Sequence, residues 1–427
     1  MSKLYDENFP HMSPVWSRIF PIEAVRAEGS CIYAADGRRY LDFTCGIGVT
    51  NTGHCHPKVV EAIREQAGLF LHGQTNIVIH EPMLRFIEEL RTIAPPGIDG
   101  YFFSNSGAEA VEGAVKLARA ASGKPNVIVF AGSFHGRTAA TQALTTSKTG
   151  YKAGRPLLPS GVYIAPYPYP FRLGLDEEAA SVHCLEALDE LFATQSAPSE
   201  TACVLIEPVL GEGGYVPPPR SFMKGLRELC TKNGIFLVFD EIQCGFGRTA
   251  RFFAQEHYGV TPDIMTAAKG IASRMPLSGV FSSLDLMRKW PTGSHGGTYG
   301  GNPVSMAAGA ATIAAMKEER MLENAEARGE QLRAGLRAVA GRHPELAEVR
   351  GLGLMVGSEF AVGGKGLPGA KAPVKAILKG CEERGLLLLS AGTYDSTVRW
   401  IPPLNVSAAQ VDEALEIFGA AADEALG

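Results

Sequence analysis

Short apolar runs alternate with longer stretches of helical periodicity through the middle of the chain. Four runs are almost entirely apolar, as strands are when a parallel sheet is covered on both faces, and they lie at 127–130, 202–208, 235–240 and 263–267. Between them lie helical patterns, such as 108–121 and 221–233, the first with apolar residues at helical spacing. This alternation predicts an α/β fold with a mainly parallel central sheet.

The pattern changes after about residue 302. A long helical stretch rich in Ala, Glu and Arg is followed by a strand-like run, a Gly/Pro/Lys-rich stretch and a closing strand and helix. Near the N-terminus, strand-like runs are broken by a turn at Asp36-Gly37. We therefore predict a large domain over 56–310, a smaller α+β domain over 311–427, and an N-terminal segment over 1–55 that packs with the small domain.

Composition and charge exclude several classes of protein. Of the 427 residues, 45% are hydrophobic and 20% are charged, as in ordinary globular proteins. The net charge of −5 is spread without long blocks of one sign, so the chain offers no basic face for nucleic acid. The most apolar stretches, such as 304–316, are too short to span a bilayer, and we expect no membrane partner.

The N-terminal residues and the cysteines indicate a cytoplasmic protein. Residues 1–16 contain neither an apolar core nor a small-residue cleavage site, so they do not resemble a secretory signal. The eight cysteines are scattered, form no Cys-x-x-Cys pair and lie partly in apolar runs. Such a pattern is typical of reduced, partly buried thiols rather than of a disulfide framework.

Several familiar catalytic and metal-binding motifs are missing from the sequence. There is no Gly-x-Ser-x-Gly elbow, no His-Glu-x-x-His pair and no Walker A loop. Gly46-Ile47-Gly48 lacks the third glycine of a dinucleotide-binding fingerprint, and we interpret it as a tight turn. The adjacent residues 54–56 (HCH) do not easily reach one tetrahedral ion, so we interpret them as a turn and predict no metal site.

Three features together fit one cofactor. Asp240 ends an apolar strand, where open α/β sheets usually bind ligands. Lys269 follows the next strand in an apolar neighbourhood that disfavours its ammonium form. Ser106 opens a helix whose free N–H groups suit a phosphate. Singly, these residues could be a capping acid, a solvated lysine and a plain N-cap. Their joint occurrence favours pyridoxal phosphate, which needs all three.

The chain also resembles the class III (ω-amino) aminotransferases, which have the pyridoxal phosphate fold type I, and among them most closely the 4-aminobutyrate aminotransferases. The resemblance extends over nearly the whole chain and implies a large domain with a mainly parallel sheet, a smaller α+β domain, and pyridoxal 5'-phosphate as cofactor. It rests on segments 46–58 (GIGVTNTGHCHPK), 105–112 (NSGAEAVE), 134–138 (FHGRT), 207–214 (EPVLGEGG), 240–249 (DEIQCGFGRT), 268–270 (AKG), 297–303 (GTYGGNP) and 398–404 (VRWIPPL).

The resemblance implies roles for residues around the cofactor ring. Lys269 would bond to the cofactor aldehyde and later move the proton, while Asp240 would pair with the protonated pyridine nitrogen. Phe134 would stack on one face of the ring, Ile242 would pack on the other, and Gln243 would reach the ring hydroxyl. Many relatives have tyrosine in place of Phe134, so a hydroxyl contact is lost here but the stacking is kept.

The resemblance also implies a phosphate site shared between subunits. Ser106, Gly107 and Ala108 would hold the phosphate, joined by Thr298 from the neighbouring subunit, and His135 would be a further cofactor-binding residue. Because one ligand of the cofactor comes from a second copy, we expect a homodimer or a dimer of dimers.

Four residues would determine the substrate specificity of such an enzyme. Ile47 would line the pocket, Arg137 would bind the carboxylate far from the reacting amine, and Arg399 would bind the α-carboxylate of 2-oxoglutarate. Glu207 would pair with Arg399 when the substrate has no α-carboxylate, which offsets the cost of an unpaired guanidinium in a closed pocket. Arg274 stands where glycine is common in the family, and we assign it no role.

The sequence thus favours a ping-pong transaminase that moves an amino group from an ω-amino acid to 2-oxoglutarate. The favoured donor is 4-aminobutyrate, and the products are then the semialdehyde and glutamate. An acetylornithine or ornithine aminotransferase is an alternative, although 386–404 favours the aminobutyrate type. An amino-acid racemase or epimerase would keep Lys269 and Asp240 without a keto acid. A non-enzymatic module is disfavoured because Lys269 is intact. The exact amino donor stays open.

Overall fold

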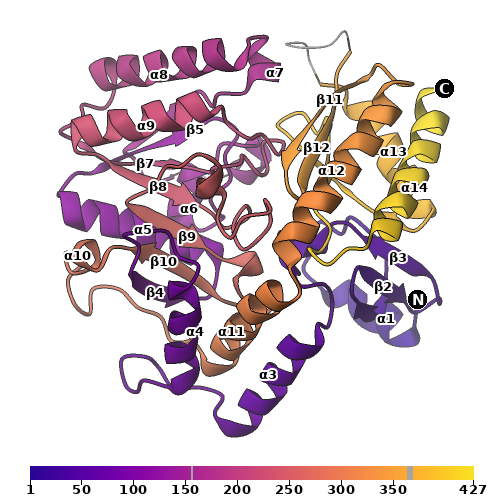
Figure 1. The fold of residues 1–427 in the computed structure, drawn as a ribbon, viewed down its shortest axis with the longest axis horizontal. Helices are drawn as coiled ribbons and strands as arrows, with labels where there is room; N and C mark the ends of the chain where they lie inside the picture. The colour runs from indigo at the N-terminus through magenta and orange to yellow at the C-terminus, as the bar shows by residue number, and fades with distance from the viewer. Residues whose placement is uncertain (155–156, 363–368) are drawn as a thin grey trace.

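The computed structural model describes residues 1–154, 157–362 and 369–427, which form a large and a smaller unit side by side (Figure 1). The large unit is built on a seven-stranded sheet with the order β4 (Gly100–Ser104), β10 (Ser278–Ser282), β9 (Ile264–Ala267), β8 (Phe236–Asp240), β7 (Thr201–Ile206), β5 (Asn126–Phe130) and β6 (Val162–Ala165). Neighbouring strands from β9 to β6 are parallel, whereas β10 is antiparallel to both β9 and β4. The predicted α/β fold with a mainly parallel sheet is confirmed.

Helices cover both faces of this sheet, which explains why its strands are apolar throughout. On β8, Val238 packs in the cluster that contains the apolar face of α5 (Gly107–Ser122). Leu237 and Phe239 point to the other face, where they join the cluster that contains side chains of α8 (Glu177–Thr194) and α9 (Arg220–Asn233). Because successive residues of a strand alternate between faces, both sets must be apolar.

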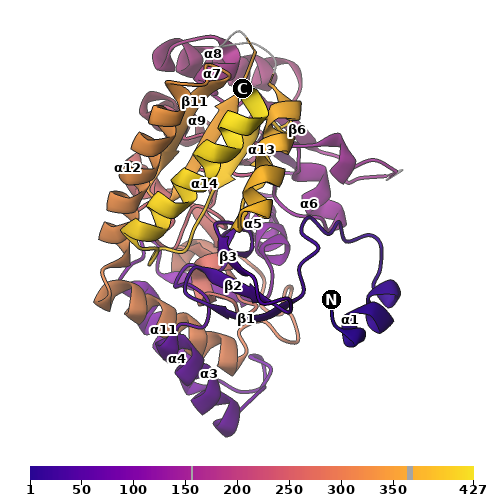
Figure 2. The same cartoon turned by 90° about the vertical axis from the view of Figure 1, so that its right-hand side faces the viewer.

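The smaller unit combines an antiparallel sheet with three helices, which face the viewer in Figure 2. The sheet has the order β11 (Leu346–Leu352), β12 (Met355–Phe360), β15 (Thr397–Trp400) and β14 (Leu389–Ala391), and the helices are α12 (Met321–Ala340), α13 (Lys371–Glu383) and α14 (Ala408–Leu426). A second sheet joins N-terminal β1 (Ala24–Glu28), β2 (Cys31–Ala34) and β3 (Arg39–Asp42) to C-terminal β13 (Leu386–Leu387), which is parallel to β3.

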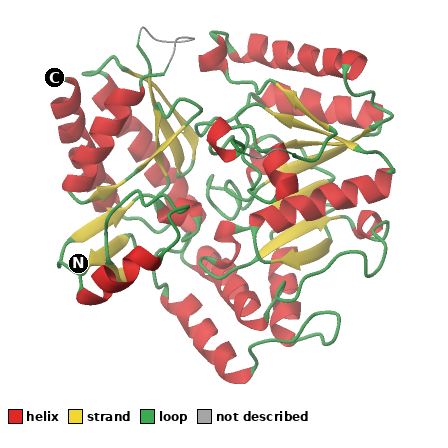
Figure 3. Cartoon of the chain, turned by 180° about the vertical axis from the view of Figure 1, so that it is seen from behind, coloured by secondary structure: helices red, strands yellow, loops and turns green. Residues whose placement is uncertain are grey.

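Helices α3 (Pro57–Leu69), α4 (Glu81–Arg91) and α11 (Pro303–Glu318) pack together at the base of the molecule, as Figure 3 shows from behind. The predicted boundary at residue 310 falls inside α11, and the domain limits stay predictions. No helix in the described ranges is long and apolar enough to cross a membrane. The remaining short elements are α1 (Lys3–Asn8), η1 (Phe9–His11), α2 (Cys45–Gly48), α6 (Ala139–Leu144), η2 (Thr149–Tyr151), α7 (Pro170–Leu173), η3 (Ala254–His257), η4 (Lys269–Ala272) and α10 (Leu284–Met287).

Candidate active site

Asp240 and Lys269 lie at the carboxyl ends of two adjacent parallel strands. Asp240 is the last residue of β8, and its Oδ2 is hydrogen-bonded to His135 Nδ1 at 2.7 Å. Its Oδ1 accepts hydrogen bonds from the Ile242 N–H at 3.1 Å and the Thr266 hydroxyl at 3.3 Å. Both strands end at the same edge of the sheet, so a ligand at this edge meets the carboxylate and the amine together.

Lys269 is half-buried, with Glu212, Asp240 and Arg399 around its amine. Burial lowers its pKa below the ordinary value of a lysine, and Arg399 acts in the same direction, while the carboxylates of Glu212 and Asp240 oppose this shift. Lys269 has φ = 48°, in the left-handed region, at the first position of η4. The lowered pKa makes the neutral, nucleophilic form of the amine more accessible.

The N-terminus of α5 lies against Ile242, two residues after Asp240. The Ser106 hydroxyl caps the helix by accepting a hydrogen bond from the Glu109 N–H, and the Glu109 carboxylate accepts one from the Ser106 N–H at 2.7 Å. A Cβ on Gly107 would lie 3.0 Å from Ile242 Cδ1, so a side chain here would push the Ile242 side chain aside. The N–H groups of Gly107 and Ala108 have no carbonyl four residues earlier in the helix, and thus suit an anion.

The segment with Phe134 and His135 completes this side of the site. A Cβ built on Gly136 would lie 2.8 Å from the Ala108 Cβ, which places the segment against the first turn of α5. The Phe134 N–H donates to Glu207 Oε2 at 3.0 Å, and the Gly211 N–H donates to Glu207 Oε1 at 3.1 Å. Burial raises the pKa of Glu207 to about 7; nearby His135 reduces this shift and Asp240 adds to it.

The structure does not show the expected pairing of Glu207 with Arg399. Arg399 instead pairs with Glu212, with 2.5 Å between Nη1 and Oε1, and the two side chains are 8% and 11% exposed. Burial alone would raise the pKa of Glu212, but the charge and hydrogen bond of Arg399 bring it below the ordinary value. Glu207 directly follows β7 and is occupied by backbone N–H groups, whereas Glu212 lies in the hairpin closed by the Leu210–Val216 bridge.

Ile47, Gln243 and Arg137 lie around the same site. Ile47 is 41% exposed and has φ = 65°, a strained value for a β-branched residue. A Cβ on the next residue, Gly48, would lie 3.5 Å from Gln243 Cγ, so this loop borders Gln243. Gln243 Oε1 is buried without a hydrogen-bond partner among the described residues. The guanidinium of Arg137 is exposed and lies 5.6 Å from the centroid of the Phe134 ring.

Thr298 lies apart from these residues. It is exposed and lines a shallow surface cavity with Gln74, Asn76 and Lys116. Within the described ranges of a single chain, Thr298 makes no hydrogen bond or ion pair with a residue of the site. The structure therefore brings together the predicted site residues other than Thr298, while their roles toward a cofactor and a substrate stay predictions.

Glu212 is the residue that the sequence reasoning missed. It belongs to the segment 207–214 (EPVLGEGG), which contains two glutamates five positions apart. The sequence feature that could have indicated Glu212 is the run of glycines around it, because Gly-rich loops turn tightly and approach other backbones closely. Only the folded hairpin shows that this glutamate reaches β15, which carries Arg399.

Comparisons with known proteins identify the family of this chain. A family model described as aminotransferase class-III matches residues 12–422. The chain is 41% identical over 411 residues to a 4-aminobutyrate aminotransferase of Escherichia coli K12, covering 96% of this chain and 95% of the relative. It is 40% identical over 408 residues to a 5-aminovalerate aminotransferase of Pseudomonas aeruginosa, covering 95% of each.

Solved structures lead to the same family. A PLP-bound amine transaminase from an uncultivated Pseudomonas species superposes with a TM-score of 0.90 at 27% identity, covering 97% of this chain and 98% of the other. The family match covers nearly the whole chain and includes the strand ends with Asp240 and Lys269. This chain therefore belongs to the class III aminotransferases, which are pyridoxal-phosphate-dependent enzymes.

Proposed function

We propose that this chain transfers the amino group of an ω-amino acid, first of all 4-aminobutyrate, to 2-oxoglutarate by a ping-pong mechanism. The observation that supports the proposal most is the buried Arg399–Glu212 pair beside Lys269. Such a pair can present either a neutralised surface or a free guanidinium to the substrate. An enzyme that alternates between a monocarboxylate and a dicarboxylate needs both states.

The residues present fit pyridoxal phosphate. Gln243 Oε1 is a buried acceptor without a partner in the described part of the chain, so a hydroxyl of the cofactor would satisfy it. Ser106, Gly107 and Ala108 would hold the phosphate at the N-terminus of α5. Asp240 would hold the ring nitrogen. When bound, the cofactor supplies an aldehyde that takes up the amino group and a ring that withdraws electrons from the reacting carbon.

The chain's own residues keep the reacting groups in place. The His135 ring and two hydrogen bonds from Ile242 and Thr266 hold the Asp240 carboxylate in one orientation. Lys269, whose pKa is lowered by burial, would accept and return the proton at its Nζ.

Two arginines would bind the substrate carboxylates. Arg137, at the exposed side of Phe134, would hold the carboxylate far from the amine in both half-reactions. Arg399 would bind the α-carboxylate of glutamate or 2-oxoglutarate. The two oxygens of a carboxylate match two parallel N–H groups of a guanidinium. With 4-aminobutyrate, which has no second carboxylate, Glu212 would stay on Arg399 and keep the charge paired.

We infer that the active enzyme is a homodimer or a dimer of dimers. Thr298 is exposed, and its loop lies beside the segment 69–79. The Thr75 hydroxyl donates to Gly300 O, and the centroids of the His72 and Tyr299 rings are 5.2 Å apart. Four large apolar side chains of this segment are more than half exposed: Leu69, Leu71, Ile77 and Ile79. An apolar surface next to a predicted cofactor ligand suits a second copy of the chain.

The thiols support a cytoplasmic location. All eight cysteines are free, and seven of them are buried. Structural thiols of this kind suit a reducing compartment.

A donor panel tests the proposed function. The purified enzyme would be mixed with 2-oxoglutarate and 4-aminobutyrate, 5-aminovalerate, ornithine, N-acetylornithine or lysine, and glutamate would be measured, with Lys269→Ala as background. We expect the highest kcat/KM with 4-aminobutyrate. Glutamate from N-acetylornithine or ornithine alone would favour the alternative aminotransferase. Inversion of an amino acid without any keto acid would instead indicate a racemase or epimerase.

A further inference from the structure

The hairpin that carries Glu212 is held at its backbone by the small unit. The Gly392 N–H donates to the Glu212 carbonyl at 2.9 Å. Arg350, on β11, donates to the Gly214 carbonyl through Nη2 at 2.6 Å and through Nε at 3.2 Å. Three hydrogen bonds from the unit that also supplies Arg399 thus hold the backbone at Glu212 and Gly214.

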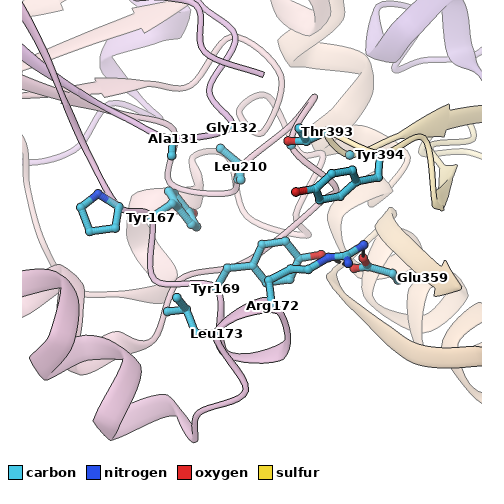
Figure 4. Close-up of a pocket in the computed structure, with 13 residues that line it drawn as sticks. Ala131, Gly132, Tyr167, Tyr169, Arg172, Leu173, Leu210, Glu359, Thr393 and Tyr394 are labelled. Atoms are coloured by element: carbon cyan, nitrogen blue, oxygen red, sulfur yellow. Dashed lines mark hydrogen bonds and ion pairs between the residues drawn. The ribbon is translucent and has the colours of Figure 1, made fainter. Parts of the chain in front are cut away.

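The hairpin borders a cavity on one side. A cavity of about 490 Å³ lies between the two units, and Leu210 and Gly213 of the hairpin line it (Figure 4). Thr393 and Tyr394 face it from the small unit, and Tyr169 and Arg172 face it from the large unit. On this side of the hairpin, the hydrogen bonds from Gly392 and Arg350 therefore add to the packing of Leu210 and Val216 in the core.

Arg350 is itself held firmly. Its side chain is 9% exposed, pairs with Glu348 and with Glu359, the latter at 2.6 Å, and lies 4.9 Å from the centroid of the Tyr169 ring. Burial alone would lower its pKa, but Tyr169 and these carboxylates raise it above the ordinary value of an arginine. The guanidinium is therefore a charged, fixed fork.

Gly214 is the residue that lets this fork approach the hairpin. Its φ is 129°, which side chains rarely adopt, and a Cβ there would lie 2.9 Å from Arg350 Nη2. The backbone conformation therefore favours glycine, and a side chain at this position would displace the Arg350 guanidinium.

We propose that Arg350 is a positioning residue for substrate selection, which acts by holding the Gly214 carbonyl so that the Glu212 carboxylate stays on Arg399. This inference rests on the proposed function. A monocarboxylate donor requires Glu212 on Arg399, whereas a dicarboxylate requires Glu212 to leave. A firmly held hairpin therefore favours the monocarboxylate, and a loosened one favours the dicarboxylate.

Two variants loosen the contact from opposite sides. Arg350→Lys keeps the charge but loses the fork, and Gly214→Ala displaces the guanidinium from the hairpin. Arg333→Lys is the matched control, because the Arg333 side chain is 10% exposed and donates to a backbone carbonyl, Gly353 O at 3.2 Å, on the small unit away from the hairpin.

The readout is the ratio of two half-reactions, with 4-aminobutyrate and with glutamate, followed at the cofactor absorbance in single turnovers. We expect the ratio of kcat/KM for 4-aminobutyrate to that for glutamate to fall about tenfold in Arg350→Lys and in Gly214→Ala, because each loses part of a charged hydrogen bond. The ratio should stay unchanged in Arg333→Lys.

Two results would overturn this inference in distinguishable ways. If the wild-type enzyme accepts both substrates but Arg350→Lys and Gly214→Ala lower both half-reactions equally, Arg350 serves only to stabilise the fold. If the wild-type enzyme accepts no monocarboxylate ω-amino acid while it still accepts glutamate, the proposed function fails and the inference fails with it.

Discussion

Glu212→Ala should change which substrate the enzyme prefers more than it changes the overall rate. Arg399 is 8% exposed, and Glu212 is its ion-pair partner at 2.5 Å. With 4-aminobutyrate bound, the variant encloses an unpaired guanidinium, whereas bound glutamate supplies a replacement carboxylate. The ratio of the two half-reactions compares two bound states of one protein, so any change in the free enzyme cancels.

The magnitude follows from the burial of the pair. Breaking a buried ion pair by removing one partner costs about 3–5 kcal/mol, and each 1.4 kcal/mol corresponds to about tenfold in rate. Water that enters the space left by the side chain screens part of this cost, so the lower limit applies. We expect the ratio of kcat/KM for 4-aminobutyrate to that for glutamate to fall roughly 100-fold.

Single-turnover kinetics of each half-reaction, followed at the cofactor band, measure this ratio. Glu207→Ala is the control, because Glu207 binds the N–H groups of Phe134 and Gly211 rather than Arg399 and should slow both half-reactions to a similar extent. Arg399→Ala should shift the ratio in the opposite direction. A shift in Glu207→Ala with none in Glu212→Ala would refute the reasoning and restore the pairing expected from the sequence.

Three further predictions follow from other parts of the site. Lys269→Ala should abolish turnover, and borohydride reduction of the wild type followed by peptide mapping should label Lys269; a label on another lysine would contradict the assignment. Burial raises the pKa of Glu207 from its ordinary 4.5 to about 7 in the folded protein, so the contribution of Glu207 to the free energy of unfolding is complete below about pH 4.5 and is lost as the pH rises through 7. Glu207→Gln should remove this pH dependence, which amounts to about 3 kcal/mol. Denaturant titrations at several pH values measure it, and an unchanged dependence of the free energy of unfolding on pH would argue against a buried neutral carboxyl. Arg274→Gly should raise the Tm by about 1–3 °C in a thermal melt. Arg274 has φ = 133°, and its Nε and Nη2 are buried without a partner in the described part of the chain. A fall in Tm would show that the guanidinium has a favourable partner.

The chain's local patterns determine much of the fold. The apolar runs at 127–130, 235–240 and 263–267 correspond to β5, β8 and β9, since a strand between two helical layers must be apolar on both faces. The position of Asp240 and Lys269 was predictable for the same reason, because parallel strands that are neighbours in the sheet end at one edge.

The antiparallel strand β10 could not be predicted in this way. Its sequence, Ser278–Ser282 (SGVFS), has few apolar residues and no clear alternation, and its place between β4 and β9 depends on pairing with strands distant in the sequence. The pairing of β3 with β13, which joins the two ends of the chain, is equally non-local.

The partner of Arg399 shows the same limit within the site. Glu207 and Glu212 lie in one motif, and both are chemically suitable, so the sequence alone determines that a carboxylate is near and not which one. The choice is made by tertiary structure. Backbone N–H groups from two other segments occupy Glu207, while the hairpin held by Gly392 and Arg350 carries Glu212 to β15. Periodicity reports which face of an element is buried, whereas an ion pair depends on how separate elements meet, and only the folded chain decides that.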